Sequence, residues 1–304
     1  MVRLALVKMP GLSPEDAAGR SERWRSILRQ PPGTDGARLA TRLWDLISWN
    51  EESLVSDFAR RQADSAEKPA GPYHMVNDEW VWIGPGARVQ PGAVLDASKG
   101  PVIIDAGATI GANAVLQGPC YVGASAQITP TALIRPGTSI GAVSKVGGEV
   151  SNSVIFGYSN KAHEGFLGDS YVGKWVNLGA GTITSNLKNT YGTITARAAE
   201  GEVKSGRRFL GSIIGDHAKT GIGTRLTCGA YVGFCAMIAA SGIAPKFTPS
   251  FSFITDAGQQ PYRADKAVEV IGTVFARRDR AMDEVDREII AYAAAAAPKV
   301  ESGG

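Results

Sequence analysis

"IDAGATIGANAVLQGPCYVGASAQITPTALIRPGTSIGAVSKV" (residues 104–146) repeats with a period of six. An aliphatic residue recurs at every sixth position, eight times in succession: Ile104, Ile110, Leu116, Val122, Ile128, Ile134, Ile140 and Val146. The residue after the aliphatic is often glycine. An amphipathic helix repeats every 3.6 residues and a half-buried strand every two, so neither produces a strict six.

The same period continues on both sides of this stretch. It includes Ile83, Val89 and Leu95 before it, and Val172, Leu178, Ile214, Thr220, Leu226, Val232 and Ile238 after it. Hexads of this kind predict an all-β solenoid, a parallel β-helix, in which each short strand points one aliphatic residue inward and glycine or a small residue takes each corner. Three hexads make one coil, and stacked coils bury a continuous aliphatic column. A β-sandwich, the alternative, predicts spacings scattered over about 8–12 residues.

The chain divides into three parts by pattern. Residues 1–72 are expected to form a helical N-terminal segment and linker, with one helix after Ser13 and a second through Leu39–Phe58. Residues 73–255 are the predicted β-helix. In residues 256–304, apolar side chains from Val268 to Tyr292 step by threes and fours, which predicts one long amphipathic helix that packs against another element.

Composition excludes several classes of function. A formal charge of +3 over 304 residues is too small to indicate a nucleic-acid partner. No apolar run approaches the roughly 18 residues that a membrane span needs. The three cysteines lack metal-type spacing, so we expect buried thiols, no bound metal and a cytoplasmic location.

The hexads fail in two places, and insertions in solenoids often lie on the binding face. The first is "GGEVSNSVIFGYSNKAHEGFLGD" (147–169). The second, "SNLKNTYGTITARAAEGEVKSGRRFLG" (185–211), is rich in lysine and arginine. We therefore expect the functional site near these two interruptions.

Three motifs carry a resemblance to a known family: "LIRPG" (133–137), "NKAHEGFLGDSYVGKWVNLGAGTITSNL" (160–187) and "SGRRFLGSIIGDHAKTGI" (205–222). Residues 38–255 resemble the C-terminal acetyltransferase half of the bifunctional glucosamine-1-phosphate acetyltransferase/N-acetylglucosamine-1-phosphate uridyltransferase (GlmU-type) family. The branch with an "SGRR" loop is the most similar. The resemblance implies a left-handed β-helix, a homotrimer, acetyl-CoA as co-substrate and an amino-sugar 1-phosphate as acceptor, with glucosamine or galactosamine as the sugar.

The resemblance also assigns roles on the sugar side. His163 matches the catalytic base, with three residues between it and "LGD", and Arg135 matches an arginine that contacts the sugar phosphate. Asn177 and Asn186 match two asparagines that bind sugar hydroxyl or amino groups. These residue types suit the chemistry, because histidine accepts a proton near neutral pH and arginine binds phosphate.

On the donor side, Ala180 matches a backbone contact near the acetyl group. Ile222 and Ala240 lie in coils where the family holds coenzyme A, largely through backbone groups. The acetyl oxygen gains negative charge during transfer, and backbone N–H groups at the glycine-rich corner 179–181 are candidates to stabilise it.

The chain departs from the family's pattern at two positions that concern phosphate. Phe166 stands where the family has a tyrosine, and a lysine expected near Ser151 is absent. Lys161 is near enough in sequence to compensate. Other candidates are Lys188, Arg207 and Arg208.

Each assignment has a structural alternative. A lone histidine is more often structural, as we expect for His217 and His74, and Asn177 and Asn186 could belong to an asparagine ladder. Phe166 and Trp175 could simply pack on the coil surface, and the Arg207–Arg208 pair could be only a solvated loop.

Two other functions compete with the acetyltransferase. A zinc hydrolase on the same β-helix, the γ-type carbonic anhydrase, needs three convergent histidines. A non-catalytic trimeric scaffold or regulatory partner of a separate nucleotidyltransferase is also open. Uridylyl transfer is not expected, because the residues before the hexads lack a glycine-rich nucleotide loop.

Overall fold

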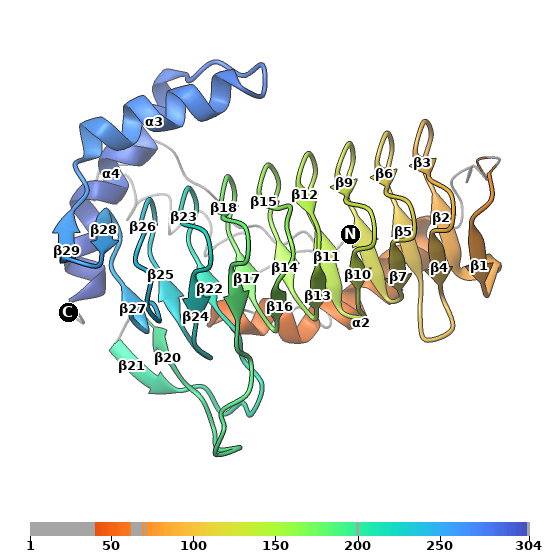
Figure 1. The fold of residues 1–304 in the computed structure, drawn as a ribbon, viewed down its shortest axis with the longest axis horizontal. Coiled ribbons are helices and arrows are strands. Elements are labelled where there is room, and N and C mark those ends of the chain that lie inside the picture. The colour runs from red at the N-terminus through yellow and green to blue at the C-terminus, as the bar shows by residue number, and fades with distance from the viewer. Residues whose placement is uncertain (1–39, 62–68, 70, 199–200, 303–304) are drawn as a thin grey trace, which may run out of the picture.

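The structure, a computed structural model, describes residues 40–61, 69, 71–198 and 201–302. It is a parallel β-helix whose coils stack along one axis (Figure 1). Sheet A contains β1 (His74–Val76), β4 (Val94–Asp96), β7 (Val115–Gln117), β10 (Leu133–Ile134), β13 (Glu149–Ser151) and β16 (Phe166–Gly168). Two further strands, β19 (Ile183–Thr184) and β24 (Arg225–Leu226), continue it in the later coils.

Two more sheets complete the prism. Sheet B contains β2 (Val81–Ile83), β5 (Val102–Ile104), β8 (Cys120–Val122), β11 (Thr138–Ile140), β14 (Val154–Ile155), β17 (Tyr171–Val172), β22 (Ile213–Ile214), β25 (Tyr231–Val232) and β27 (Phe247–Thr248). Sheet C contains β3 (Arg88–Val89), β6 (Thr109–Ile110), β9 (Gln127–Ile128), β12 (Lys145–Val146), β15 (Asn160–Lys161), β18 (Asn177–Leu178), β23 (Lys219–Thr220), β26 (Met237–Ile238) and β28 (Ser252–Thr255). The antiparallel strand β29 (Gly258–Pro261) ends sheet C, so the sheet continues beyond the expected boundary at residue 255.

The hexad aliphatics form the core, as predicted. Leu95, Leu116 and Ile134 of sheet A are fully buried and pair in register, and the hexad residues of sheets B and C do the same. A single apolar cluster runs through the solenoid. The predicted parallel β-helix of hexapeptide repeats is therefore confirmed, and its left-handedness remains an expectation from the resemblance.

The glycines of the repeat have two distinct functions. Gly107, three residues after an inward aliphatic, has φ = 67°, a left-handed conformation. Gly111 directly follows an inward aliphatic, and a Cβ there would lie 2.4 Å from the backbone nitrogen of Pro130 in the next coil. One glycine is needed for backbone conformation and the other for the close stacking of coils.

The first interruption of the hexads consists of short coils. Ile128 pairs with Val146 across an interval of 18 residues, whereas Val146 pairs with Lys161 across an interval of 15. The inward position is kept, but Lys161 occupies it in place of an aliphatic residue. The second interruption leaves the solenoid, and its middle forms a hairpin of β20 (Thr195–Ala198) and β21 (Gly201–Lys204).

Helices cover part of the solenoid. The helix α2 (Leu43–Arg61) lies along sheet B, where Trp44 and Ile47 pack with Tyr171 and Ile213. The short 3₁₀ helix η1 (Asp78–Trp80) joins β1 to β2. The helix expected after Ser13 lies outside the described residues. Among the described helices, none has the length and apolarity to cross a membrane.

The C-terminal segment forms two helices, which corrects the expectation of one. The first, α3 (Ala264–Ala276), ends before Asp279, whose φ is 52°. The second, α4 (Glu284–Glu301), begins at Asp283 with a capping box in which Asp283 and Asp286 bind each other's backbone N–H groups. The polar run between the helices and this cap interrupt the apolar stripe.

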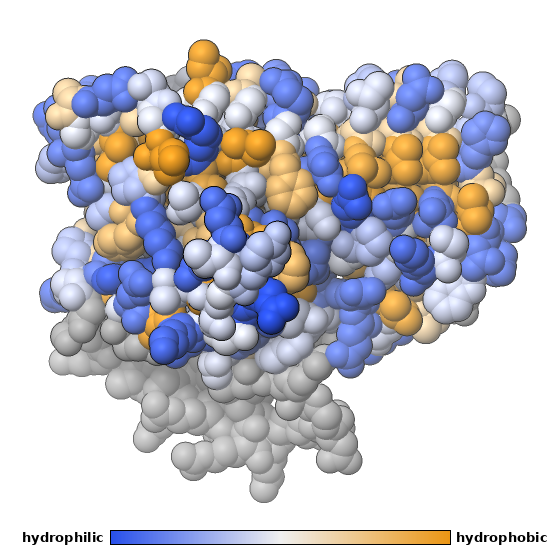
Figure 2. All heavy atoms as spheres, turned by 60° about the horizontal axis from the view of Figure 1, so that its bottom comes forward, coloured by the Kyte–Doolittle hydropathy of each residue, from blue (hydrophilic) through white to orange (hydrophobic). Residues whose placement is uncertain are grey.

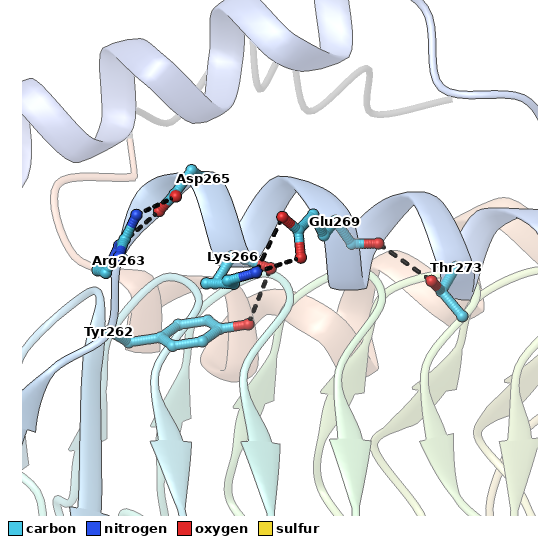
Figure 3. A network of polar contacts seen from close by, with 6 residues as sticks. All are labelled: Tyr262, Arg263, Asp265, Lys266, Glu269 and Thr273. Carbon is cyan, nitrogen blue, oxygen red and sulfur yellow. Dashed lines mark hydrogen bonds and ion pairs between the residues drawn. The ribbon is translucent and has the colours of Figure 1, made fainter.

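The C-terminal helices cover the edge between sheets B and C. Ile271 and Phe275 of α3 bury Trp175 and Cys235 there, so Trp175 packs on the coil as one of the alternatives expected. The N-terminal end of α3 is polar where it is exposed. It carries the pairs Arg263–Asp265 and Lys266–Glu269, and Tyr262 donates to the carbonyl of Lys266 (Figure 3).

Candidate functional site

Four of the predicted site residues lie in one column along the edge between sheets C and A. His163, Ala180, Ile222 and Ala240 each follow, by two positions, an inward-facing residue of sheet C in successive coils. We call the corner segments 162–165, 179–182, 221–224 and 239–242 the C–A edge. Adjacent coils are about 4.8 Å apart, so this column is about 14 Å long.

His163 is exposed on the C–A edge, and glycines allow its backbone to approach the preceding coil. A Cβ at Gly148 would lie 3.0 Å from the carbonyl oxygen of His163. On the other side, Gly165 has φ = 116°, and a Cβ there would lie 2.3 Å from the carbonyl oxygen of Thr182. The imidazole therefore stands on a tightly packed backbone that only glycine neighbours permit.

Lys161 points into the solenoid and only 3% of its surface is exposed. Its Nζ donates to the carbonyl oxygens of Gly147, at 2.8 Å, and His163, at 2.7 Å. Burial lowers the pKa of Lys161 to about 8, and the Glu164 carboxylate opposes this shift. The ammonium is held inside the coil, so this geometry gives no support to the phosphate contact predicted for Lys161.

This contact interrupts a ladder of backbone hydrogen bonds along the C–A edge. At four other coils the corner residue with positive φ donates to the preceding coil, as Thr131 does to Ala112 at 2.9 Å and Gly223 to Ala180 at 2.7 Å, whereas Gly148 makes no such bond within the described residues. The equivalent acceptor for Gly181 is the carbonyl of His163, which is bonded to the ammonium of Lys161 instead. Within the described part of the chain, the N–H groups of Ala180 and Gly181 have no hydrogen-bond partner.

Phe166 and Asn186 lie close together on sheet A, with Phe166 beside the C–A edge and Asn186 at the other end of the strands, next to Asp169 on the edge between sheets A and B. A Cβ at Gly168 would lie 2.3 Å from the Phe166 ring and 3.0 Å from Asn186 Nδ2, so glycine at position 168 makes room for both side chains. Asn186 Nδ2 donates to Asp169 at 2.6 Å, and Asn152 Nδ2 donates to the other oxygen of the same carboxylate at 2.7 Å. Asp169 therefore fixes the orientation of the Asn186 amide.

Arg135 lies on the same face of sheet A, in an earlier coil. Its Nε forms an ion pair with Glu149 at 2.7 Å, and 46% of its side chain is exposed. Glu149 pairs in register with Phe166 and thus lies between Arg135 and the C–A edge. An incoming phosphate could replace this partly exposed carboxylate as the partner of the guanidinium.

Asn177 is exposed on the sheet C side of the C–A edge, whereas Asn186 lies on the sheet A side. The Oδ1 atom of Asn177 accepts a hydrogen bond from Asn160 Nδ2 at 3.4 Å. The Oδ1 atom of Asn160 in turn accepts one from Arg278 at 3.0 Å. The C–A edge and the width of sheet A therefore separate the two asparagines, Asn177 and Asn186, which do not face each other within one chain. No pattern in the sequence indicates that Arg278, far away in the chain, orients the Asn160–Asn177 pair.

The insertion adds basic side chains beside Asn186. An antiparallel bridge between Leu187 and Phe209 sets Lys188 opposite Arg208 at its base, where Arg208 is exposed. Arg207 instead donates to the hydroxyl of Ser48 in α2. The two arginines therefore differ in their surroundings. Arg207 holds the insertion to α2, whereas Arg208 is exposed to solvent.

His217 lies on the edge between sheets B and C, away from His163. It is buried, and its ring packs against Trp175, Phe234 and Phe275, as expected of a structural histidine. His74 is exposed in the first coil. The three histidines do not converge. The described residues contain no group of three or more histidine, cysteine, aspartate or glutamate side chains that could hold a metal ion.

The cysteines are free in the structure. Cys120 and Cys235 are buried, as expected, whereas Cys228 is only partly buried. Burial raises the pKa of both buried thiols to about 12. They are therefore protonated side chains of the core.

The fold and the edge define a hexapeptide-repeat β-helix protein with one open polar edge. The chain is similar to the "Bifunctional protein GlmU" of Bordetella parapertussis, 32% identical over 204 residues that cover 60% of this chain and 44% of that protein. It is similar also to the "Bifunctional sugar-1-phosphate nucleotidylyltransferase/acetyltransferase" of Sulfurisphaera tokodaii, 37% identical over 142 residues, 46% of this chain and 35% of that one. The resemblance inferred from the motifs is thereby confirmed.

This similarity has limits that bear on function. The chain spans less than half the length of these curated relatives. No family model matches the chain. Among solved structures, an Arabidopsis UDP-N-acetylglucosamine acyltransferase matches with 12% identity and a TM-score of 0.30, over 69% of this chain and 73% of that one. So weak a match carries no argument, and the fold rests on the strand pairing described above.

Proposed function

We propose that this protein transfers an acetyl group from acetyl-CoA to the amine of an amino-sugar 1-phosphate, with glucosamine or galactosamine as the sugar. The observation that carries the proposal is the C–A edge, where His163 stands beside the two N–H groups of Ala180 and Gly181. A base next to unpaired N–H donors on an exposed edge is suited to acyl transfer to an amine.

The chemistry follows from these groups. The amine nitrogen attacks the thioester carbonyl, and His163 takes the proton that the nitrogen loses. The N–H groups of Ala180 and Gly181 stabilise the oxyanion. When the tetrahedral intermediate collapses, the C–S bond breaks and the coenzyme A thiolate leaves with the proton returned from His163. The products are the N-acetyl sugar phosphate and free coenzyme A.

The two substrates would approach from different directions. The arm of coenzyme A would follow the column from Ala180 through Ile222 to Ala240, where Ile222 is 82% exposed and offers apolar surface. The sugar would lie over Phe166, with Asn186 holding its polar groups. Its phosphate would bind Arg135, and Arg208 at the base of the insertion is the best-placed substitute for the lysine that the family has.

We also propose that the protein forms a homotrimer through sheet A. The outward residues Val94, Val115 and Leu133 follow one another across this sheet and are only partly covered. Figure 2, in which the lower side of Figure 1 faces the viewer, shows hydrophobic atoms in a run along this face. A neighbouring chain on sheet A would cover this stripe and bring its own groups toward Phe166 and Asn177.

A thiol-release assay tests the function directly. Acetyl-CoA is supplied with glucosamine 1-phosphate, galactosamine 1-phosphate or the same sugars without phosphate. The proposal predicts turnover only with a phosphorylated amino sugar. Absence of turnover with every amine, together with no binding of coenzyme A by calorimetry, would favour the non-catalytic scaffold, which the absent tyrosine hydroxyl at Phe166 keeps open.

A further inference from the structure

The buried lysine of the C–A edge is not used by the mechanism above, although a charge inside an aliphatic column is costly. Every other coil with a strand pair at this position of sheet C places an uncharged residue there, as Val146 does before Lys161 and Leu178 after it. The chain keeps an ammonium where a methionine would fill the same space. A buried charge of this kind is expected where the charged group has a functional role.

We infer that Lys161 is a positioning residue that holds the His163 backbone and keeps the Gly181 N–H free to bind the reacting oxygen. This inference rests on the proposed function and deepens it.

The Lys161 ammonium makes two hydrogen bonds that join neighbouring coils. Nζ joins the carbonyl of Gly147 in one coil to the carbonyl of His163 in the next. The segment between Lys161 and Phe166 contains Gly165, and Gly148 with φ = 68° faces it. Glycines provide no side-chain packing that would hold this corner, so the ammonium is the contact that fixes the backbone from which His163 projects.

The carbonyl of His163 is also an acceptor in the ladder of corner bonds. The ladder of corner bonds would pair the Gly181 N–H with the carbonyl of His163, as Gly223 pairs with that of Ala180. A carbonyl oxygen can accept two hydrogen bonds, but the His163 carbonyl accepts from the ammonium and receives no bond from Gly181 in the structure. An N–H already bonded within the chain could not stabilise an oxyanion without breaking that bond.

The inference predicts an unusual combination in the variant Lys161→Met. Methionine fits an apolar column without a charge, so the melting temperature at pH 7 should equal or exceed that of the native protein. The kcat should fall roughly 10- to 1,000-fold, because both the base and one oxyanion donor are affected. The KM for acetyl-CoA should change less than about threefold. Lys99→Met, at an exposed position in an early coil, removes the same charge and is the control.

Hydrogen exchange at single amides supplies a readout that does not depend on activity. Without the ammonium, the His163 carbonyl becomes free to accept the Gly181 N–H, so exchange of the Gly181 amide should slow in Lys161→Met and stay unchanged in Lys99→Met. Faster exchange throughout 162–182 with a lower melting temperature would show a merely structural lysine and overturn the inference. An unchanged Gly181 amide or an undiminished kcat would do the same. If the native protein has no acyltransferase activity, the proposed function fails while the exchange experiment still decides whether Lys161 keeps Gly181 free.

Discussion

Single residues decide how closely the coils stack, and glycine does so in two ways. A Cβ at Gly111 would lie 2.4–2.7 Å from three backbone atoms of the next coil, whereas at Gly107 it would meet nothing nearer than 3.4 Å. Gly111→Ala must push coils apart and should cost about 1–3 kcal/mol or more. Gly107→Asn has only a positive φ to tolerate, as Asn113 already does, and should cost less than about 1 kcal/mol. Urea denaturation of both variants compares them, and equal losses would contradict the distinction.

The charge of Lys161 gives the stability a defined pH dependence. Its folded pKa of about 8 lies below the ordinary value of 10.5, so the unfolded chain binds more protons between these two values. The penalty of the buried charge is complete below pH 8 and fades as the pH rises toward 10.5. The advantage in unfolding free energy of Lys161→Met over the native protein should therefore shrink across this window. Denaturant titrations at pH 7.5, 9 and 10 measure it, and a constant difference would contradict the assignment.

Much of the site could be predicted at the residue scale, and some could not. The family resemblance selected His163, Ala180, Ile222 and Ala240, and the stacking of their coils explains why they form one column. The interior position of Lys161 was missed, because the preceding coil is three residues shorter than its neighbour and the period that identifies inward residues was lost there. Nothing in the sequence shows which carbonyl an ammonium will bind.

Among the elements, the helix α3 is attached to the solenoid through one apolar cluster. Phe275 of α3 is 1% exposed, and its ring packs on Trp175 with centroids 4.5 Å apart. Phe275→Ala should cost about 3–5 kcal/mol in this attachment and release α3 from the edge between sheets B and C. The β-helix core lies elsewhere and should remain. Limited proteolysis would then cut near α3 while the far-UV β signal persists; loss of both together would contradict this account.

The sequence pattern predicted one helix at the C-terminal end, and the structure has two, α3 and α4. Apolar residues recur at helical spacing on both sides of 277–283, so periodicity alone predicts one helix. The capping box at Asp283 and the positive φ of Asp279 are local features that a periodic pattern does not contain. Periodicity predicted which residues face the solenoid, and capping determined where each helix ends.

For the whole molecule, the three faces of the prism differ in what can bind them. Sheet B is covered by α2, and the outward row of sheet C is polar in the early coils, with Arg88, Thr109 and Gln127. Sheet A alone offers an apolar row there. Val115→Glu would bury a carboxylate in a trimer contact and should produce monomers, because an unpaired charge in an apolar interface is costly. The matched Thr109→Glu, on sheet C in the same coil, should stay trimeric. Light scattering measures both, and a trimer that persists in Val115→Glu would exclude sheet A as the contact.

The central claim is that His163 removes the proton from the attacking amine. The most direct test is the kcat of His163→Ala with acetyl-CoA and glucosamine or galactosamine 1-phosphate, whichever the native protein acetylates. General-base catalysis contributes about 10²–10⁴-fold, so kcat should fall by that factor while circular dichroism and the melting temperature stay close to the native values. Because His163 is exposed and outside the core, no loss of fold is expected. A folded His163→Ala variant with undiminished kcat would contradict the account.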